Sequence, residues 1–94
     1  MDRREASDIA ESILEELRDI SYHDLVVDYL DAQVHSEVVA DSGTRYTVEV
    51  DASWDSKDPG DLRVMVAIDD GGWSAISPVH TSFIIAPDGS FVGE

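Results

Sequence analysis

The sequence predicts an α+β fold in which two N-terminal helices pack on one face of a four-stranded, antiparallel, meander-like sheet. Apolar residues recur with the period of a helix up to residue 32 and with a period of two from residue 34 onward. Clusters of Gly, Pro and Asp separate the segments of the second part, as expected for strands joined in sequence order. We therefore expect one domain, 1–94, with a helical part at 2–32 and a β-sheet part at 34–93.

The first helix is expected over residues 5–20. At about 100° per residue, its apolar side chains fall on one side and most of its acidic side chains on the other. The apolar set is Ile9, Ala10, Ile13, Leu14, Leu17 and Ile20. Asp2 with Glu5, or Asp8 with Glu11, resembles a capping box, and acids in a first turn also suit the helix dipole.

A second, shorter helix is expected to start at the break 21–24 and to run to about residue 32. Leu25, Val26, Tyr29 and Leu30 share one of its faces, while its aspartates point away. The pair of valines in this segment weakens the prediction, because β-branched side chains lose rotamer freedom in a helix.

Four strands are expected after the helices, at 34–41, 45–53, 62–68 and 80–86. The second strand alternates cleanly, with inward positions Tyr46, Val48, Val50, Ala52 and Trp54. Segment 73–79 is expected to be irregular because Pro78 interrupts it. A fifth strand formed by residues 90–93 is an alternative to the four-stranded sheet. The predicted core draws on both helices and three strands: Ile9, Ile13, Leu17, Tyr29, Val48, Val50, Val64, Val66, Phe83 and Ile85.

The charge excludes two classes of partner. The chain has 21 Asp and Glu against 6 Lys and Arg, which gives a formal net charge of −15. Nucleic-acid phosphates and anionic membrane surfaces both require clustered cations, so direct binding to either is not expected. Three explanations of the charge remain: adaptation to a high-salt cytoplasm, an acidic surface shaped for a basic partner, and plain solubility.

Other classes are excluded by segments and residues that the sequence lacks. No apolar run is long enough to cross a bilayer, and the first residues contain no apolar signal-peptide region, so a cytoplasmic location is expected. Zero cysteines exclude a disulfide framework, a zinc ribbon and a thiol nucleophile.

The reactive side chains form no catalytic or metal-binding pattern. His23, His35 and His80 fall in different predicted elements and lack the spacing of metal ligands. His80 and Ser82 share a strand face, but no nucleophile elbow accompanies them. The aspartates of loop 55–61 do not match the spacing of a Ca²⁺-binding loop. We therefore expect no catalytic residue, no cofactor and no metal site.

Two acidic surfaces are the candidates for partner binding. The first is the acidic side of the first helix, with Asp8, Glu11, Glu15 and Asp19. The second is the sheet face turned away from the helices, with candidate residues Glu37, Arg45, Glu49, Asp51, Met65 and Ile84. Apolar side chains among acids on one face are typical of an interface. The alternative is that irregular C-terminal residues cover these apolar side chains.

These observations favour a non-enzymatic, acidic protein-interaction module that binds or inhibits a basic protein, of the immunity or anti-defence type. A homodimer through the apolar part of the sheet face stays open as a further possibility. The alternative is a small housekeeping protein of a halophilic organism, in which the acidity is an adaptation to high salt.

Overall fold

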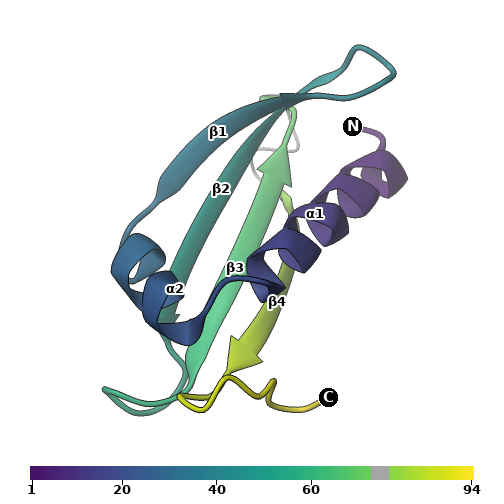
Figure 1. Cartoon of the computed structure of the whole chain (residues 1–94). Coiled ribbons are helices and arrows are strands. Elements are labelled where there is room, and N and C mark those ends of the chain that lie inside the picture. The colour runs from purple at the N-terminus through teal and green to yellow at the C-terminus, as the bar shows by residue number, and fades with distance from the viewer. Residues whose placement is uncertain (73–76) are drawn as a thin grey trace.

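The computed structural model describes residues 1–72 and 77–94, and it confirms the predicted α+β fold class. The elements in chain order are α1 Arg3–Arg18, α2 Tyr22–Tyr29, β1 Val34–Val39, β2 Arg45–Trp54, β3 Leu62–Asp69 and β4 Val79–Ile85. The strands form one sheet in the order β1-β2-β3-β4, with every neighbouring pair antiparallel (Figure 1). Positions 73–76, part of the segment expected to be irregular, lie outside the described residues.

Both helices begin at side-chain caps: of the two starts that the sequence left open for α1, the structure has the one at Asp2, and the helix begins at Arg3, two residues earlier than expected. The Asp2 carboxylate accepts hydrogen bonds from the backbone N–H groups of Arg4 and Glu5, each at 3.1 Å. The Ser21 hydroxyl accepts from the Asp24 N–H at 3.2 Å and starts α2. Both helices end earlier than expected. After α2, Leu30 takes an extended backbone and bridges Ala52 of β2, so the chain leaves the helix before residue 32.

The sheet has an inner face, covered by the helices, and an outer face. α1 packs on β3 and β4, and α2 packs on β2 and β3 (Figure 1). Along β2 and β3 every second residue is buried, as the predicted alternation requires, and the register pairs Val50 with Val66. Segment 90–93 forms only an isolated bridge between Phe91 and Ile85, so the alternative of a fifth strand is wrong.

The core confirms seven of the ten predicted residues: Leu17, Val48, Val50, Val64, Val66, Phe83 and Ile85 are buried. The prediction is wrong for Ile9, Ile13 and Tyr29, which are only half-buried. On α1 their place is taken by Ala6, Ala10 and Leu14, which with Leu17 repeat every three or four positions. The small alanines let α1 approach the sheet closely. The isoleucines, turned by roughly 60–100° around the helix, lie toward β1 instead.

The C-terminal stretch is fastened to the end of α1 by an aromatic and ionic cluster. The rings of Phe83 and Phe91 meet edge to face, with centroids 5.5 Å apart. The Arg18 guanidinium lies 5.1 Å from the first ring centroid and 4.8 Å from the second, and it pairs with Glu94 at 2.6 Å. Phe91 is thereby held on the inner side of the sheet.

Candidate interaction surfaces

The strand register brings the six predicted sheet residues to the outer face. Glu49 lies opposite Ala67, and Asp51 opposite Met65, at the centre of the sheet. The other predicted residues lie around this centre on the same face: Glu37 opposite Thr47, Arg45 opposite Val39, and Ile84 opposite Arg63. Both α1 and α2 pack on the inner face, so neither of these described helices covers the outer face. The alternation of side chains along each strand was therefore enough to predict which residues share this face.

The arginines of the outer face are neutralised within the chain. Arg45 pairs with Glu37 at 2.7 Å, and Arg63 pairs with Asp55 at 2.7 Å. Glu49 and Asp51 have no ion pair among the described residues. Both are half-buried and line a shallow hollow of about 100 Å³ together with Met65, Ala67 and His80. The centre of the face thus combines two carboxylates with apolar surface.

The C-terminal stretch is attached to the edge of the sheet and to its inner side. The Val92 N–H donates to the Ile84 carbonyl at 2.9 Å, while Phe91 packs against Phe83 on the inner face. Met65 and Ile84 are half-buried on the outer face. The alternative concerned both Met65 and Ile84: within residues 77–94, these contacts place Phe91 on the inner side, away from both side chains, and hold Val92 against the backbone of Ile84.

The four predicted acids of α1 are all exposed, but they have different surroundings. Glu11 accepts a hydrogen bond from the Thr81 hydroxyl of β4 at 2.8 Å. Glu15 lies 3.8 Å from the Arg18 guanidinium, and Asp19 caps the C-terminal end of the helix. Asp8 lies on another side and lines a groove next to β1. Two of the four carboxylates are therefore engaged within the chain, so this is a weaker candidate surface than the sheet face.

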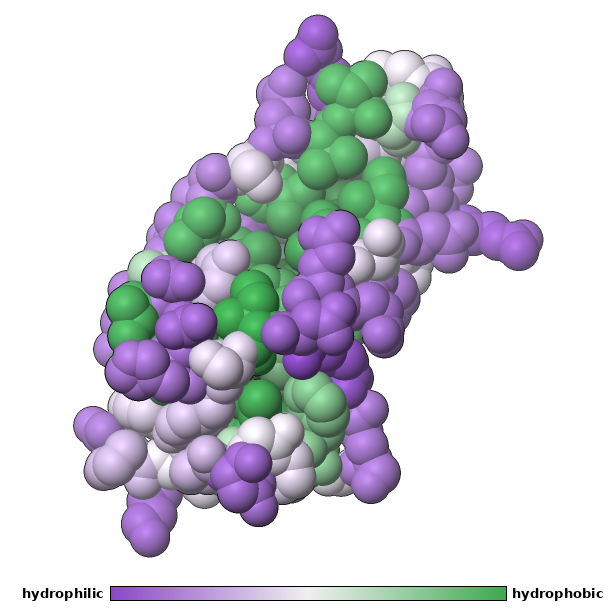
Figure 2. Space-filling model, in the orientation of Figure 1, coloured by the Kyte–Doolittle hydropathy of each residue, from purple (hydrophilic) through white to green (hydrophobic). Residues whose placement is uncertain are grey.

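An open groove between α1 and β1 is a surface that sequence reasoning missed. It consists of two adjoining hollows of about 470 Å³ and about 330 Å³ that share Val38. Its apolar lining comes from α1, α2 and the inner side of β1 and β2, and includes Ile9, Ile13, Ile20, Tyr29, Val34, Val38, Val48 and Val50. Figure 2 shows this lining as an apolar band between hydrophilic flanks. We call this surface the α1–β1 groove.

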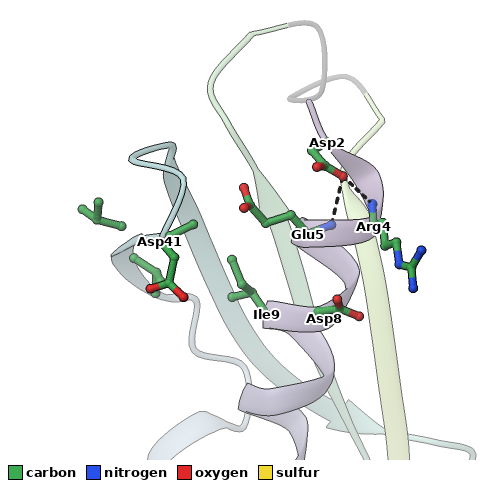
Figure 3. Close-up of a pocket in the computed structure, with 9 residues that line it drawn as sticks. Asp2, Arg4, Glu5, Asp8, Ile9 and Asp41 are labelled. Atoms are coloured by element: carbon green, nitrogen blue, oxygen red, sulfur yellow. Dashed lines mark hydrogen bonds between the residues drawn. The ribbon is translucent and has the colours of Figure 1, made fainter.

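Acidic side chains surround the α1–β1 groove. Five carboxylates and one guanidinium line it: Asp2, Glu5, Asp8, Glu16 and Asp41, with Arg4. In Figure 3, Ile9 and Glu5 extend from α1 toward the β1–β2 turn that carries Asp41, whereas Arg4 points away from that turn. The groove is therefore an apolar floor with a rim of negative charge.

A partly buried hydrogen bond holds the first turn of α1 at the end of the groove that Glu5 lines. The Tyr46 hydroxyl, on a fully buried side chain of β2, donates to Glu5 Oε1 at 2.7 Å. The Ser42 hydroxyl, from the β1–β2 turn, donates to the same oxygen at 2.9 Å. Burial, together with this carboxylate, raises the pKa of Tyr46 to about 12. The first turns of α1 are thus tied to β2 and to the turn beyond β1.

Two signals in the sequence pointed to the groove. The apolar side chains of α1 spread around the helix axis over a wider angle than the contact with the sheet alone can bury. Some of them therefore had to lie at the side of the helix rather than beneath it. Val34 and Val38 occupy inward positions on the first strand of a meander, which is an edge strand. Neither signal says on which strands α1 lies, and that placement creates the groove.

Within residues 1–72 and 77–94, no group of three or more His, Asp and Glu side chains is arranged to hold a metal ion. Neither described helix has the length and hydropathy needed to span a bilayer. Comparison of the chain with protein-family models, with curated proteins and with solved structures finds no match.

Proposed function

We propose that this protein is a non-enzymatic interaction module that docks the outer face of its sheet on a basic protein surface. The observation that carries the proposal is the arrangement of Glu49 and Asp51. These two carboxylates lie half-buried on the second strand, beside Met65, while the arginines of the same face are paired within the chain.

This arrangement suits a partner that combines Lys or Arg with apolar side chains. The apolar hollow at Met65 and Ala67 offers contact area, and the carboxylates beside it select the sign of the partner's charge. The net charge of −15 adds long-range attraction that speeds encounter with a basic protein. No chemical step is required of the module, because occupancy alone blocks or recruits the partner.

A stoichiometric inhibitor of the immunity or anti-defence type, acting in the cytoplasm, is the narrower form of the proposal. An inhibitor needs only a surface complementary to the basic site that it occludes. The four-stranded sheet offers such a surface on an element with regular register rather than on a loop.

Charge reversal at the centre of the face tests the proposal. The variant Glu49→Lys/Asp51→Lys is compared with the unmodified protein and with a control, Asp24→Lys/Asp28→Lys, which makes the same charge change on exposed positions of α2. Proteins captured from cells of the source organism are purified and titrated against all three. We expect saturable binding that only the outer-face variant loses, together with a loss of its salt dependence. Equal affinity for the outer-face variant and the control contradicts the assignment.

The alternative, a housekeeping protein adapted to high salt, is favoured by a different observation. Exposed acids occur on both helices, on the loops and, at Glu37, on the sheet, rather than on one face, and the chain contains one lysine, Lys57. Such a distribution keeps a protein hydrated when salt screens its self-repulsion. The salt dependence of unfolding separates the two functions.

A further inference from the structure

We propose that the α1–β1 groove is a second docking site, and that it binds an amphipathic helix of a basic partner. The site lies on the opposite side of the sheet from Glu49 and Asp51 and does not depend on the function proposed for the outer face. The groove supplies the shape, the apolar floor and the charge that select this kind of ligand.

The shape of the groove fits a helix lying beside α1. Its lining runs along α1 from Arg4 to Leu17, a length of roughly 20 Å at about 1.5 Å per residue, with Asp2 and Ile20 just beyond the two ends of the helix. Its floor consists of side chains on the inner face of β1 and β2, which is the layer in which α1 and α2 already pack on the sheet (Figure 1). A third helix placed there would lie over β1 and extend the helical layer toward that edge of the sheet.

The apolar floor is incompletely covered by the chain itself. Val34 of β1 is 41% exposed, and Val38, Ile9 and Ile13 are only half-buried although they adjoin the core. Large aliphatic side chains at such positions gain stabilisation when a ligand removes them from water. The apolar stripe of an amphipathic helix, repeating every three or four residues, would contact both the α1 isoleucines and the β1 valines.

The charge of the rim selects a basic occupant. Hydrogen bonds within the described chain engage the carboxylates of Asp2 and Glu5. Asp8, Glu16 and Asp41 have no such bond among the described residues and remain available to Lys or Arg beside the apolar stripe of a ligand. A second copy of this chain would bring another net charge of −15 to this rim, so self-association through the groove is electrostatically opposed.

The test uses a synthetic peptide as probe. The peptide has about 14 residues, roughly 21 Å as a helix, with leucines on one face and lysines elsewhere. One control peptide has the same composition with the leucines distributed around the helix, and a second replaces every lysine by glutamate. Binding is measured by fluorescence anisotropy at about 0.15 M salt. We expect saturable one-to-one binding of the first peptide. Absence of binding, or equal binding of the rearranged peptide, contradicts the proposal.

Matched variants locate the binding site. Ile9→Gln/Ile13→Gln removes two apolar side chains from the floor and introduces glutamine, a good helix former, so we expect it to weaken binding by roughly tenfold or more. The control is Val27→Gln, which changes a 67% exposed valine of α2 that does not line the groove. Equal affinity of the unmodified protein and the double variant contradicts the proposal. So does loss of binding in the outer-face charge-reversal variant with retention in the double variant, because this places the peptide on the other surface.

A measurement on the unmodified protein keeps the test independent of variant folding. In methyl NMR spectra, we expect the peptide to shift the signals of Ile13, Val34 and Val38 and to leave those of Val27 and Val92 in place. Shifts confined to Val27 or Val92, or to the outer face at Met65, contradict the proposal. Sedimentation of the protein without peptide tests whether a second copy of the chain occupies the groove. A dimer that dissociates in Ile9→Gln/Ile13→Gln identifies a second copy as the ligand and also overturns the proposal.

Discussion

The hydrogen bond between Tyr46 and Glu5 is predicted to make a measurable contribution to stability, and Tyr46→Phe removes it while preserving the ring. The hydroxyl of a fully buried tyrosine donates to a half-buried carboxylate at 2.7 Å. A hydrogen bond to a charged group typically contributes about 1.5–3 kcal/mol. We take the lower end, about 1.5 kcal/mol, because Glu5 keeps its hydrogen bond from Ser42.

The assay is urea and thermal unfolding at neutral pH. For a domain of this size, a loss of about 1.5 kcal/mol lowers Tm by roughly 6–12 °C. The matched control is Tyr29→Phe, which removes a hydroxyl that has no hydrogen bond among the described residues. We expect the control to change Tm by little, and the cycle with Glu5→Gln to reveal a coupling free energy of about 1 kcal/mol.

The pH dependence supplies a second, independent readout. The fold raises the pKa of the Tyr46 phenol from 10.0 to about 12, so the folded state favours the neutral phenol. This contribution is fully present below pH 10 and is lost as the pH rises from 10.0 to about 12. Unfolding of the unmodified protein should therefore show a steeper loss of stability in this window than unfolding of Tyr46→Phe. Parallel pH curves, or a variant as stable as the Tyr29→Phe control, would refute the reasoning.

Three further predictions concern the helix start, the C-terminal cluster and the salt dependence. Asp2→Ala removes the cap of α1 and should cost about 1 kcal/mol in urea unfolding, whereas Asp2→Ser, which keeps a capping oxygen, should cost less. Phe91→Ala should lower the free energy of unfolding by about 2 kcal/mol, less than for a fully buried phenylalanine, because Phe91 is half-buried; a loss below about 0.5 kcal/mol would show that the ring contact with Phe83 is not stabilising. If the acids serve a partner, the protein should be folded at about 0.15 M KCl. A chain that is unfolded at low salt, and whose Tm rises steadily as the KCl concentration increases into the molar range, would assign the charge to salt adaptation.

The secondary structure could be predicted because its signals are local. Alternation along 45–53 predicted which side chains of β2 face inward, and Asp2 and Ser21 marked the helix starts. The bridge from Leu30 to Ala52 could not be predicted in this way. It joins residues far apart in the chain, and it ends α2 earlier than local propensity indicates.

The core was predicted less well on α1 because a helical wheel does not fix the rotation of a helix against a sheet. Ile9 and Ile13 have larger apolar side chains than Ala6 and Ala10, so hydropathy alone favoured them as core. The structure places the alanines against the sheet, where small side chains permit close packing. That choice depends on the whole interface with β3 and β4 and has no local signature.

The placement of α1 on the sheet also explains why the groove was not predicted, whereas the outer face was. The outer face follows from strand period and register, which the sequence displays directly. The groove follows from the position of α1 over β3 and β4, which leaves the inner side of β1 open next to Ile13. Its acidic rim also joins residues from α1 and from the turn after β1, such as Glu5 and Asp41.

Adaptation to salt alone does not account for this groove. A surface adapted to high salt is expected to present carboxylates in place of exposed apolar area. The chain instead keeps Ile9, Ile13, Val34 and Val38 beside one another at the surface, with acids at the rim. The described arginines of the sheet and of the end of α1 pair within the chain, and Arg4, which also lines the groove, points away from the turn that carries Asp41 (Figure 3). An apolar floor with an acidic rim is the arrangement expected where a basic, amphipathic partner binds.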